Sequence, residues 1–332
     1  PHPHRDELLL FGGEHFDGRK NTFFADLLRY SLKKDEWRNV TCKPTPPPRS
    51  SHQAVAIPTG SGLLFVLGGE FSSANQSQFY HHRDMWCLDL ESWTWEQLST
   101  KNGPSPRSGH RMVHVRDRLL VFGGFFDNLR DVKYYNDAYA FDLSLYKWSK
   151  VAVAPGAPQP SPRSGCQIVA DGVAGVAYVF GGYFKKKVTM QQFDSHKDKS
   201  EVEGETGVEM RELWALDVHG DGGWRQLRRA GTAPSARSGS CMVLHKSRLV
   251  VFGGVHDEDT PDGEGLVSEF FNDLHAYSLE TGKWHAMVLT HRSNQRGAGG
   301  AKADDGSGGG PQADAEGLPL ELVAGGRRRN RN

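Results

Sequence analysis

The sequence predicts an all-β chain built from one repeated four-stranded unit, and three observations support this fold class. Runs of strand-forming residues end in a glycine pair five times, at spacings of 56, 55, 58 and 72 residues. An acidic residue then opens another apolar strand, and a tryptophan follows the acid after 11 or 12 residues. Repetition at such a period indicates an array of supersecondary units rather than one irregular core.

Each unit is expected to contain four strands, named a to d in chain order. Strand b ends at the glycine pairs Gly12-Gly13, Gly68-Gly69, Gly123-Gly124, Gly181-Gly182 and Gly253-Gly254. Strand c opens at Asp26, Asp84, Asp137, Glu212 and Asp273. Strand d carries Trp37, Trp95, Trp148, Trp224 and Trp284. A Pro-Arg-Ser or Ala-Arg-Ser signature opens strand a at Arg49, Arg107, Arg163 and Arg237.

The residue types explain why these units stack around a ring. Strand b is apolar at nearly every position, as expected when both faces of a sheet are covered. A glycine pair permits a backbone path that a Cβ would obstruct. One tryptophan per unit supplies a large apolar surface between neighbours, and we expect all five to be buried there. The pattern predicts a β-propeller with negligible helix, because blades of a propeller cover each other's faces.

The strand, glycine pair, acid and later tryptophan resemble the kelch repeat, over about residues 5–290. Stretches such as FYHHRDMW (79–86), PRSGCQ (162–167) and EFFNDLHAYS (269–278) carry the resemblance further. It implies one propeller domain over residues 1–290 and a non-enzymatic protein–protein interaction scaffold. Two alternatives stay open. One is a substrate receptor of a ubiquitin ligase, and the disfavoured one is a metal-dependent kelch enzyme, like galactose oxidase or an iron-dependent specifier.

Composition narrows the partners and the compartment. The chain has 332 residues with 40 basic and 40 acidic side chains, so no global field favours nucleic acid or a membrane surface. Its four cysteines are scattered, without a metal-binding spacing. We therefore expect other proteins as partners, membership of a larger complex, no cofactor, and a cytoplasmic or nuclear location rather than secretion.

Antiparallel strands place the b–c and d–a loops on one face of the propeller, where we expect partners to dock. Two b–c segments are long: about 183–211, which runs from basic to acidic, and the acidic 255–272. Such segments are either functional or solvated and disordered. The same face should carry a rim of Arg49, Arg107, Arg163 and Arg237, with Ser108, Ser164 and Ser238 beside them.

Two readings of these arginines remain open. Forked guanidinium groups at a channel mouth suit carboxylates, and in kelch propellers that bind acidic peptides this position touches the ligand. The resemblance carries that role to Arg107, Arg163 and Arg237, and less well to Arg49, because Ser51 replaces a glycine there. Alternatively, each arginine pairs with backbone carbonyls or with a carboxylate of a blade.

The ends of the chain break the pattern. The first unit has no Arg-Ser strand ahead of Leu8, so its blade should lack the inner strand. Residues 291–332 are glycine-rich and read as a flexible linker, with a further strand near 318–324 and a basic end from Arg327. That end is a candidate nuclear address or RNA contact. We expect six blades when the propeller is complete, and a chain cut at both ends.

Enzyme signatures are weak. The pair His81-His82 is interpreted as a solvated loop, because adjacent side chains diverge on an extended strand. The equivalent His52 and His110 suggest packing, with channel lining as the alternative. An iron-dependent specifier carries Glu-x3-Asp-x3-His, whereas here Glu258 and Asp262 precede Leu266, and Glu269 and Asp273 precede Tyr277. No metal site is therefore predicted.

Overall fold

The computed structural model describes residues 1–288 except 74–77, 129–131, 195–196, 219–222 and 261–264. Strands and turns make up this part of the chain, and none of it is helical. No described helix is long and apolar enough to span a membrane. The predicted linker over 291–332, the strand near 318–324 and the basic end lie outside the described residues.

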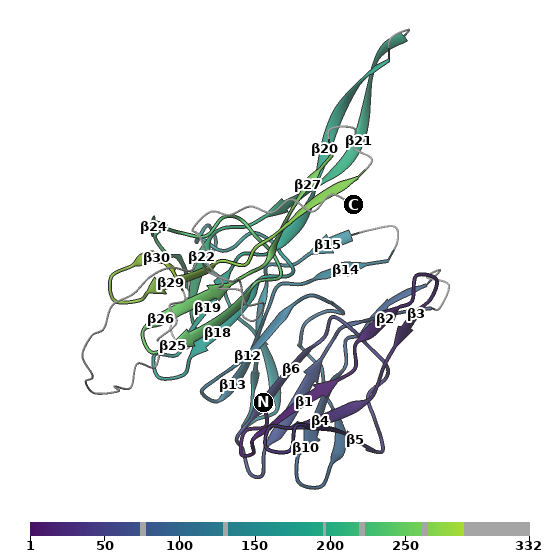
Figure 1. The fold of residues 1–332 in the computed structure, drawn as a ribbon, viewed down its shortest axis with the longest axis vertical. Coiled ribbons are helices and arrows are strands. Elements are labelled where there is room, and N and C mark those ends of the chain that lie inside the picture. Colours follow the sequence, from purple (N-terminus) through teal and green to yellow (C-terminus); the bar gives the residue numbers. More distant parts are fainter. Residues whose placement is uncertain (74–77, 129–131, 195–196, 219–222, 261–264, 289–332) are drawn as a thin grey trace, which may run out of the picture.

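Five blades follow one another in chain order (Figure 1). Blade 1 has three strands, β1 (Glu7–Phe11), β4 (Leu27–Ser31) and β5 (Glu36–Val40). Blade 2 has β6 (Gln53–Ile57), β7 (Leu63–Leu67), β10 (Met85–Asp89) and β11 (Thr94–Leu98). Blade 3 has β12 (Arg111–Val115), β13 (Arg118–Phe122), β16 (Ala138–Asp142) and β17 (Lys147–Lys150). Blade 4 has β18 (Gln167–Asp171), β19 (Val176–Phe180), β22 (Leu213–Asp217) and β23 (Trp224–Gln226). Blade 5 has β25 (Cys241–His245), β26 (Arg248–Phe252), β29 (Leu274–Ser278) and β30 (Lys283–Met287), with β24 (Ala230–Gly231) added in parallel to β30.

Blades 2 to 5 have the predicted antiparallel order a–b–c–d, and their a strands β6, β12, β18 and β25 contact one another at the centre. Backbone hydrogen bonds join these strands at their starts: Gly109 N donates to Ser51 O (3.0 Å), Gly165 N to Gly109 O (3.1 Å) and Gly239 N to Gly165 O (3.0 Å). We call this series the inner belt. Ser51 takes the left-handed φ of 52° that the three glycines also adopt, so the missing glycine does not interrupt the belt.

Each b–c connection forms a two-stranded ribbon, and these ribbons are called the hairpins. They are β2 (Glu14–Phe16) with β3 (Asn21–Phe23), β8 (Glu70–Ser72) with β9 (Phe79–His81), β14 (Phe125–Asp127) with β15 (Val132–Tyr134), β20 (Tyr183–Asp194) with β21 (Lys197–Glu209), and β27 (Val255–Asp259) with β28 (Leu266–Phe270). Describing 183–211 and 255–272 as loops was therefore wrong. Figure 1 shows β20 and β21 extending beyond every other element.

Four of the five predicted tryptophans are buried between blades. Trp95 packs 5.3 Å from the ring of Phe11, Trp224 5.0 Å from Phe122, and Trp284 5.6 Å from Phe180. In every case the aromatic partner ends strand b of the preceding blade. Trp148 joins the corresponding cluster between blades 2 and 3. The tryptophan of one blade thus covers the second strand of the blade before it.

The prediction was wrong for Trp37, which is 53% exposed. It belongs to blade 1, and no described blade precedes blade 1 to supply a partner. Phe252, which ends strand b of blade 5, is 48% exposed for the matching reason: no described blade follows with a tryptophan. Blade 1 therefore exposes the tryptophan of the inter-blade contact, and blade 5 exposes its strand-b aromatic residue.

Glycine pairs are required where one blade meets the next. All ten glycines have positive φ, such as 63° at Gly68 and 93° at Gly69. A Cβ on Gly68 would lie 2.8 Å from the carbonyl oxygen of Arg107 in the following blade. Gly69 N donates a hydrogen bond to that same oxygen (3.0 Å). A residue with a side chain at Gly68 would therefore collide with the neighbouring blade.

Candidate docking face and the buried arginines

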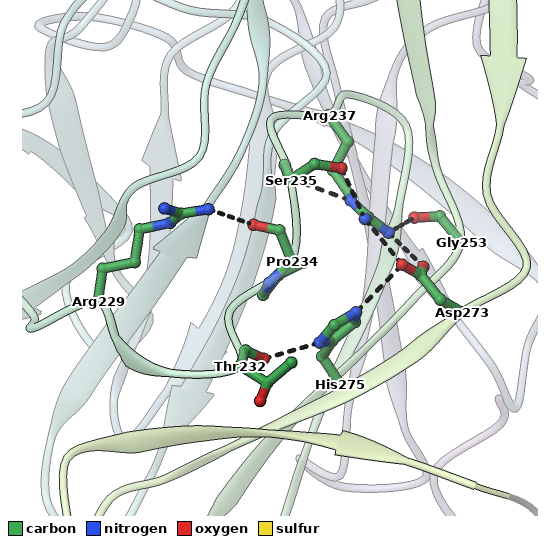
Figure 2. Close-up of polar contacts among 8 residues, drawn as sticks. All are labelled: Arg229, Thr232, Pro234, Ser235, Arg237, Gly253, Asp273 and His275. Carbon is green, nitrogen blue, oxygen red and sulfur yellow. Dashed lines mark hydrogen bonds and ion pairs between the residues drawn. The ribbon is translucent and has the colours of Figure 1, made fainter. Parts of the chain in front are cut away.

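The arginine that opens strand a is an internal tie of its own blade. In blade 5, Arg237 Nη1 donates to the carbonyl of Gly253 (2.9 Å) and to Asp273 Oδ1 (2.5 Å), while Nη2 donates to Asp273 Oδ2 (3.0 Å) (Figure 2). Its Nε donates to Ser235 O (3.2 Å). The guanidinium carbon lies 3.9 Å from the centroid of the Phe271 ring. Nη2 also donates to Ser235 Oγ (3.1 Å), so all five N–H groups of the guanidinium are used.

The same arrangement recurs in the other four-stranded blades. Arg49 binds Asp84 with both terminal nitrogens (2.8 Å each), and Arg107 binds Asp137 at 2.6 and 3.3 Å. Arg163 makes one longer contact with Glu212 (3.4 Å). The carbonyl acceptors are those of Gly68, Gly123 and Gly181, each 3.0 Å from Nη1. The acid and the arginine therefore recur together in the sequence because they form an ion pair in each four-stranded blade.

This geometry corrects the rim prediction. Arg49, Arg107, Arg163 and Arg237 are 0–1% exposed, so they do not present guanidinium groups to a partner at a channel mouth. Their positive charges are matched inside the blade, in line with the alternative that each pairs with carbonyls and a carboxylate. Charged pairs of this kind are held by fork-to-carboxylate geometry.

Two of the paired carboxylates, Asp84 and Asp273, have lowered pKa values. Burial disfavours the ionised form of Asp84, but the hydrogen bonds and charge of Arg49, with the Trp86 indole, outweigh it and lower the pKa of Asp84. In blade 5 burial is likewise outweighed by hydrogen bonds from His275 and Arg237, which lower the pKa of Asp273. His275 is itself held by the carbonyl of Thr232 (3.0 Å from Nδ1), as Figure 2 shows.

The serines after the arginines anchor the hairpins. Backbone bridges pair Ser108 with Phe125, Ser164 with Tyr183 and Ser238 with Val255 at the start of a hairpin. Ser108 Oγ also lies 2.7 Å from His81 Nδ1. Ser108 and Ser164 are buried and Ser238 is half-buried, so they support the hairpins from beneath rather than line an exposed surface.

Histidines of the second hairpin are structural too. His81 is buried against the rings of Phe125 and Phe126, at 5.4 and 5.0 Å, and its Nε2 lies 3.0 Å from the Asp127 backbone. Burial lowers its pKa. His82 Nε2 lies 3.3 Å from Pro48 O. Interpreting the pair as a solvated loop was wrong, because the hairpin folds back on its neighbours.

The other histidine and carboxylate candidates that the structure describes have packing or ion-pair roles. His110 is fully buried and His52 packs on Phe11 (5.5 Å), which supports the packing reading. Asp273 is committed to Arg237, and Asp262 lies outside the described residues. Within the described ranges, no three histidine, cysteine, aspartate or glutamate side chains are grouped to hold a metal ion.

Side chains join the five hairpins into one continuous arc, which the sequence alone did not reveal. Contacts between successive hairpins are Phe23 with Phe71 (5.2 Å), His81 with Phe125, Tyr134 with Tyr183 (6.3 Å), and His256 Nδ1 with Glu209 Oε2 (2.9 Å). We call this surface the hairpin arc. Phenylalanine or tyrosine within three positions after four of the glycine pairs was its sequence signal.

The hairpin arc also exposes apolar side chains to solvent. Phe16, Phe79, Tyr80, Val132, Val267 and Phe270 are exposed and lie on its first, second, third and fifth hairpins. Exposed aromatic residues are enriched at protein–protein interfaces. Chemically, this surface offers ring faces and backbone edges, and it brings together no described metal cluster.

Known proteins place this architecture in a family. A family model described as the KLHDC2/KLHL20/DRC7 Kelch-repeats domain matches residues 3–200 and 159–305. Similar curated proteins include the Drosophila melanogaster leucine-zipper-like transcriptional regulator 1 homolog, 27% identical over 88% of this chain, and mouse kelch domain-containing protein 1, 29% identical over 72%. This chain spans 26% and 56% of their respective lengths.

One relative is named as an enzyme. The N-(sulfonatooxy)prop-2-enimidothioate sulfolyase of Thlaspi arvense is 30% identical over 57% of this chain and 47% of its own length. The regulator homolog and kelch domain-containing protein 1 are not named as enzymes. With the family match covering most of the described residues, the chain belongs to the kelch-repeat family.

Proposed function

We propose that this protein is a non-enzymatic interaction scaffold that docks partner proteins on the hairpin arc. The observation that carries the proposal is an arc of five linked hairpins that exposes aromatic side chains in place of the expected arginine rim. Phe16, Tyr80 and Phe270 are each more than half exposed, on the first, second and fifth hairpins.

The physical support comes from rigidity and composition together. Backbone hydrogen bonds to the glycine pairs hold the hairpin bases, for example His82 N to Gly69 O (2.7 Å). Contacts between neighbouring hairpins restrain them further, so a partner meets a surface that is already ordered. Preorganised aromatic residues bind at a low entropy cost and often dominate interface energy.

A matched pair of triple variants tests the docking face. In the first, Phe16→Ser, Tyr80→Ser and Phe270→Ser remove exposed aromatic rings from the arc. In the second, Leu32→Ser, Leu145→Ser and Val173→Ser change apolar residues that are also more than half exposed, in the turns at the opposite ends of the blades. Proteins captured from cell extract on each immobilised variant are then quantified by mass spectrometry.

We expect the arc variant to lose most of the captured partners, by about tenfold or more, while the control variant keeps them. Both variants should unfold at nearly the wild-type temperature, because the altered side chains are exposed. Equal capture by both variants would contradict docking on the arc.

The same experiment bears on narrower versions of the proposal. A substrate receptor of a ubiquitin ligase would bring ligase subunits down with the arc intact. Acidic segments of partners remain a candidate ligand, although the four buried arginines are not accessible to bind them. Nucleic acid is not proposed as a partner of the described surface. A metal-dependent enzyme would show stoichiometric copper or iron in the purified protein.

The proposal includes a compartment and a nearer relationship. We propose a reducing, cytoplasmic or nuclear location, in keeping with Cys42, Cys87, Cys166 and Cys241, which are all free thiols. Imaging of the native protein tests it. From the quoted repeat segments we also infer kinship with kelch domain-containing protein 4.

We further propose that the complete ring has six blades. Trp37 and Phe252 support this, because each is an exposed half of the contact that buries the other inter-blade tryptophans. A chain carrying one additional kelch blade after residue 288 should shield Trp37 from a fluorescence quencher. Unchanged quenching would count against six blades.

A further inference from the structure

A pocket of about 440 Å³ lies between blades 4 and 5, beside the turn that joins β29 to β30. Two tyrosines form its inner wall, Tyr178 on β19 and Tyr277 on β29, which are 4% and 3% exposed. Arg225 on β23 and Arg228 just beyond that strand also line the pocket, and both are exposed. Because this turn and the hairpins are at opposite ends of the blades, the pocket is separate from the hairpin arc.

The tyrosine pair departs from the pattern of the other blade junctions. At the corresponding positions, Phe65 and Phe141 pack together between blades 2 and 3 (6.2 Å), and Leu120 and Leu216 share the cluster between blades 3 and 4. Those side chains are wholly apolar, whereas the tyrosines add two hydroxyl groups to a similar interface. Neither hydroxyl makes a hydrogen bond to another described residue. A buried hydroxyl without a partner is available to a ligand.

The pocket is open because a glycine stands where other blades carry a ring. The second residue before the strand-d tryptophan has a left-handed φ, and it is Trp93 in blade 2 and Tyr146 in blade 3. The Tyr146 ring packs 5.6 Å from that of Phe141, the residue equivalent to Tyr277. Gly282 holds this position in blade 5, and a Cβ there would lie 3.6 Å from the Tyr277 hydroxyl oxygen. An aromatic side chain at Gly282 would therefore fill the pocket.

The charges around the pocket favour an anion. Arg225 and Arg228 form no ion pair within the part of the chain that the structure describes, and Glu280 is the sole carboxylate among the described lining residues. Two positive charges therefore face one negative charge. Glu96 holds the position of Arg225 in blade 2, so the positive charge is not a feature of the repeat.

The donors suit a tetrahedral anion. Burial raises the pKa of both tyrosines, and the charge of Arg225 only partly offsets it, so both hydroxyls stay protonated and can donate. Guanidinium forks and hydroxyl donors that approach from different sides match the several oxygens of a phosphoryl group. Its charge of about −1.5 to −2 near neutral pH balances two arginines.

We propose that this pocket binds a phosphate monoester, with Arg225 and Arg228 on its oxygens and the hydroxyls of Tyr178 and Tyr277 donating from the inner wall. We call it the tyrosine–arginine pocket. The phosphoryl group belongs either to a free phosphorylated small molecule or to a phosphorylated side chain of a protein, because both sources present the same group to the same donors.

Isothermal titration calorimetry of the full chain tests this with three probes: inorganic phosphate, glucose 6-phosphate and a short glycine peptide that carries one phosphoserine. Arg225→Gln with Arg228→Gln removes the positive charge from exposed positions. Gly282→Tyr places in blade 5 the ring that blade 3 already carries. Arg229→Gln is the matched control, because Arg229 belongs to the same segment but donates to the carbonyl of Pro234 (3.1 Å) outside the pocket (Figure 2). Thermal unfolding verifies that each variant is folded.

We expect saturable binding that weakens about tenfold or more in the double arginine variant, because charge-assisted hydrogen bonds are lost. Gly282→Tyr should abolish binding although both arginines remain. Tyr178→Phe with Tyr277→Phe keeps the rings and removes the hydroxyls, and it should weaken binding several-fold. Arg229→Gln should bind as wild type.

The probes also separate the two sources of the phosphoryl group. Tighter binding of the phosphoserine peptide than of glucose 6-phosphate assigns the ligand to a phosphorylated protein, and the reverse order assigns it to a small molecule. Equal affinities show that the phosphoryl group alone is recognised.

The inference is overturned by absence of saturable binding of all three probes, by undiminished binding to Gly282→Tyr, or by equal binding to the double arginine variant and to Arg229→Gln. The variant of the hairpin arc that lacks Phe16, Tyr80 and Phe270 should bind phosphate as wild type does. A failure of the pocket therefore leaves docking on the hairpin arc untouched, and the reverse also holds.

Discussion

The four buried arginines and the hairpin arc lie next to each other, but the arginine contacts are alike from blade to blade, whereas the hairpins differ. In blades 2 to 5 the equivalent arginine donates to the equivalent glycine carbonyl at 2.9–3.0 Å and also pairs with the acid that opens strand c. The hairpins above them differ in length, charge and residue type from one blade to the next. A contact repeated from blade to blade serves the fold, whereas the hairpins can vary without disturbing the strands beneath them.

Removing one buried tie should give the largest effect. Arg107→Ala leaves Asp137 without its counter-charge, and we expect a loss of about 3–5 kcal/mol in the free energy of unfolding, toward the lower end because Asp137 keeps some solvent contact. Chemical denaturation measures it. Arg83 is exposed and lies just before β10 of blade 2, so Arg83→Ala should change the free energy of unfolding by less than about 0.5 kcal/mol. Similar losses for both would break the distinction between buried ties and surface charge.

The inter-blade contacts sharpen the comparison next. Trp148→Ala should cost about 3–5 kcal/mol because a buried ring is removed from a closed interface. Trp37→Ala removes the equivalent ring from an open edge and should cost about 1 kcal/mol or less. Thermal and denaturant unfolding of the two variants compares them directly. If Trp37→Ala proved as costly as Trp148→Ala, the first blade would have to be covered in solution.

Buried histidines beside the inner belt predict a smaller, pH-dependent effect. Burial, helped by the charge of Arg49, lowers the pKa of His52 to about 4. In the unfolded chain His52 takes up a proton near pH 6.5, whereas in the folded chain it stays neutral until about pH 4. The free energy of unfolding is therefore highest above pH 6.5 and falls between about pH 6.5 and 4. His52→Gln should flatten this slope by about one proton, measured from denaturation curves across the range. An unchanged slope would show that His52 does not stay neutral in the fold.

Much of the fold was predictable because the same glycine pair, acid and tryptophan recur in all five units and make the same kinds of contact. The glycine pairs, acids and tryptophans located every blade, and the missing Arg-Ser ahead of Leu8 matched a three-stranded first blade. Trp37 failed because burial depends on a neighbouring blade and not on the residue itself. Position in the array, rather than local sequence, decides whether that ring meets a partner.

The candidate site was less predictable for a different reason. Arg107 and Asp137 each recur with the repeat, but a charged residue near a channel mouth is compatible with a ligand or with an internal partner. Only the three-dimensional distance of 2.6 Å decides between them. The segment 183–211 was misread as a loop because its charged, polar composition hides a strand pairing that the long register from Tyr183 to Asp194 makes explicit.

Every hairpin closes at its base with the same backbone bond. The residue two positions before the acid donates its N–H to the second glycine of the pair: Phe24 to Gly13 (2.9 Å), His82 to Gly69 (2.7 Å), Tyr135 to Gly124 (2.9 Å), Met210 to Gly182 (2.8 Å) and Phe271 to Gly254 (2.9 Å). Chain beyond this clamp can lengthen or shorten without altering the strands below it, as the fourth hairpin already illustrates. Kelch blades of this design are therefore suited to exchange of hairpins, in evolution by insertion and in the laboratory by grafting, while the ring beneath keeps its shape.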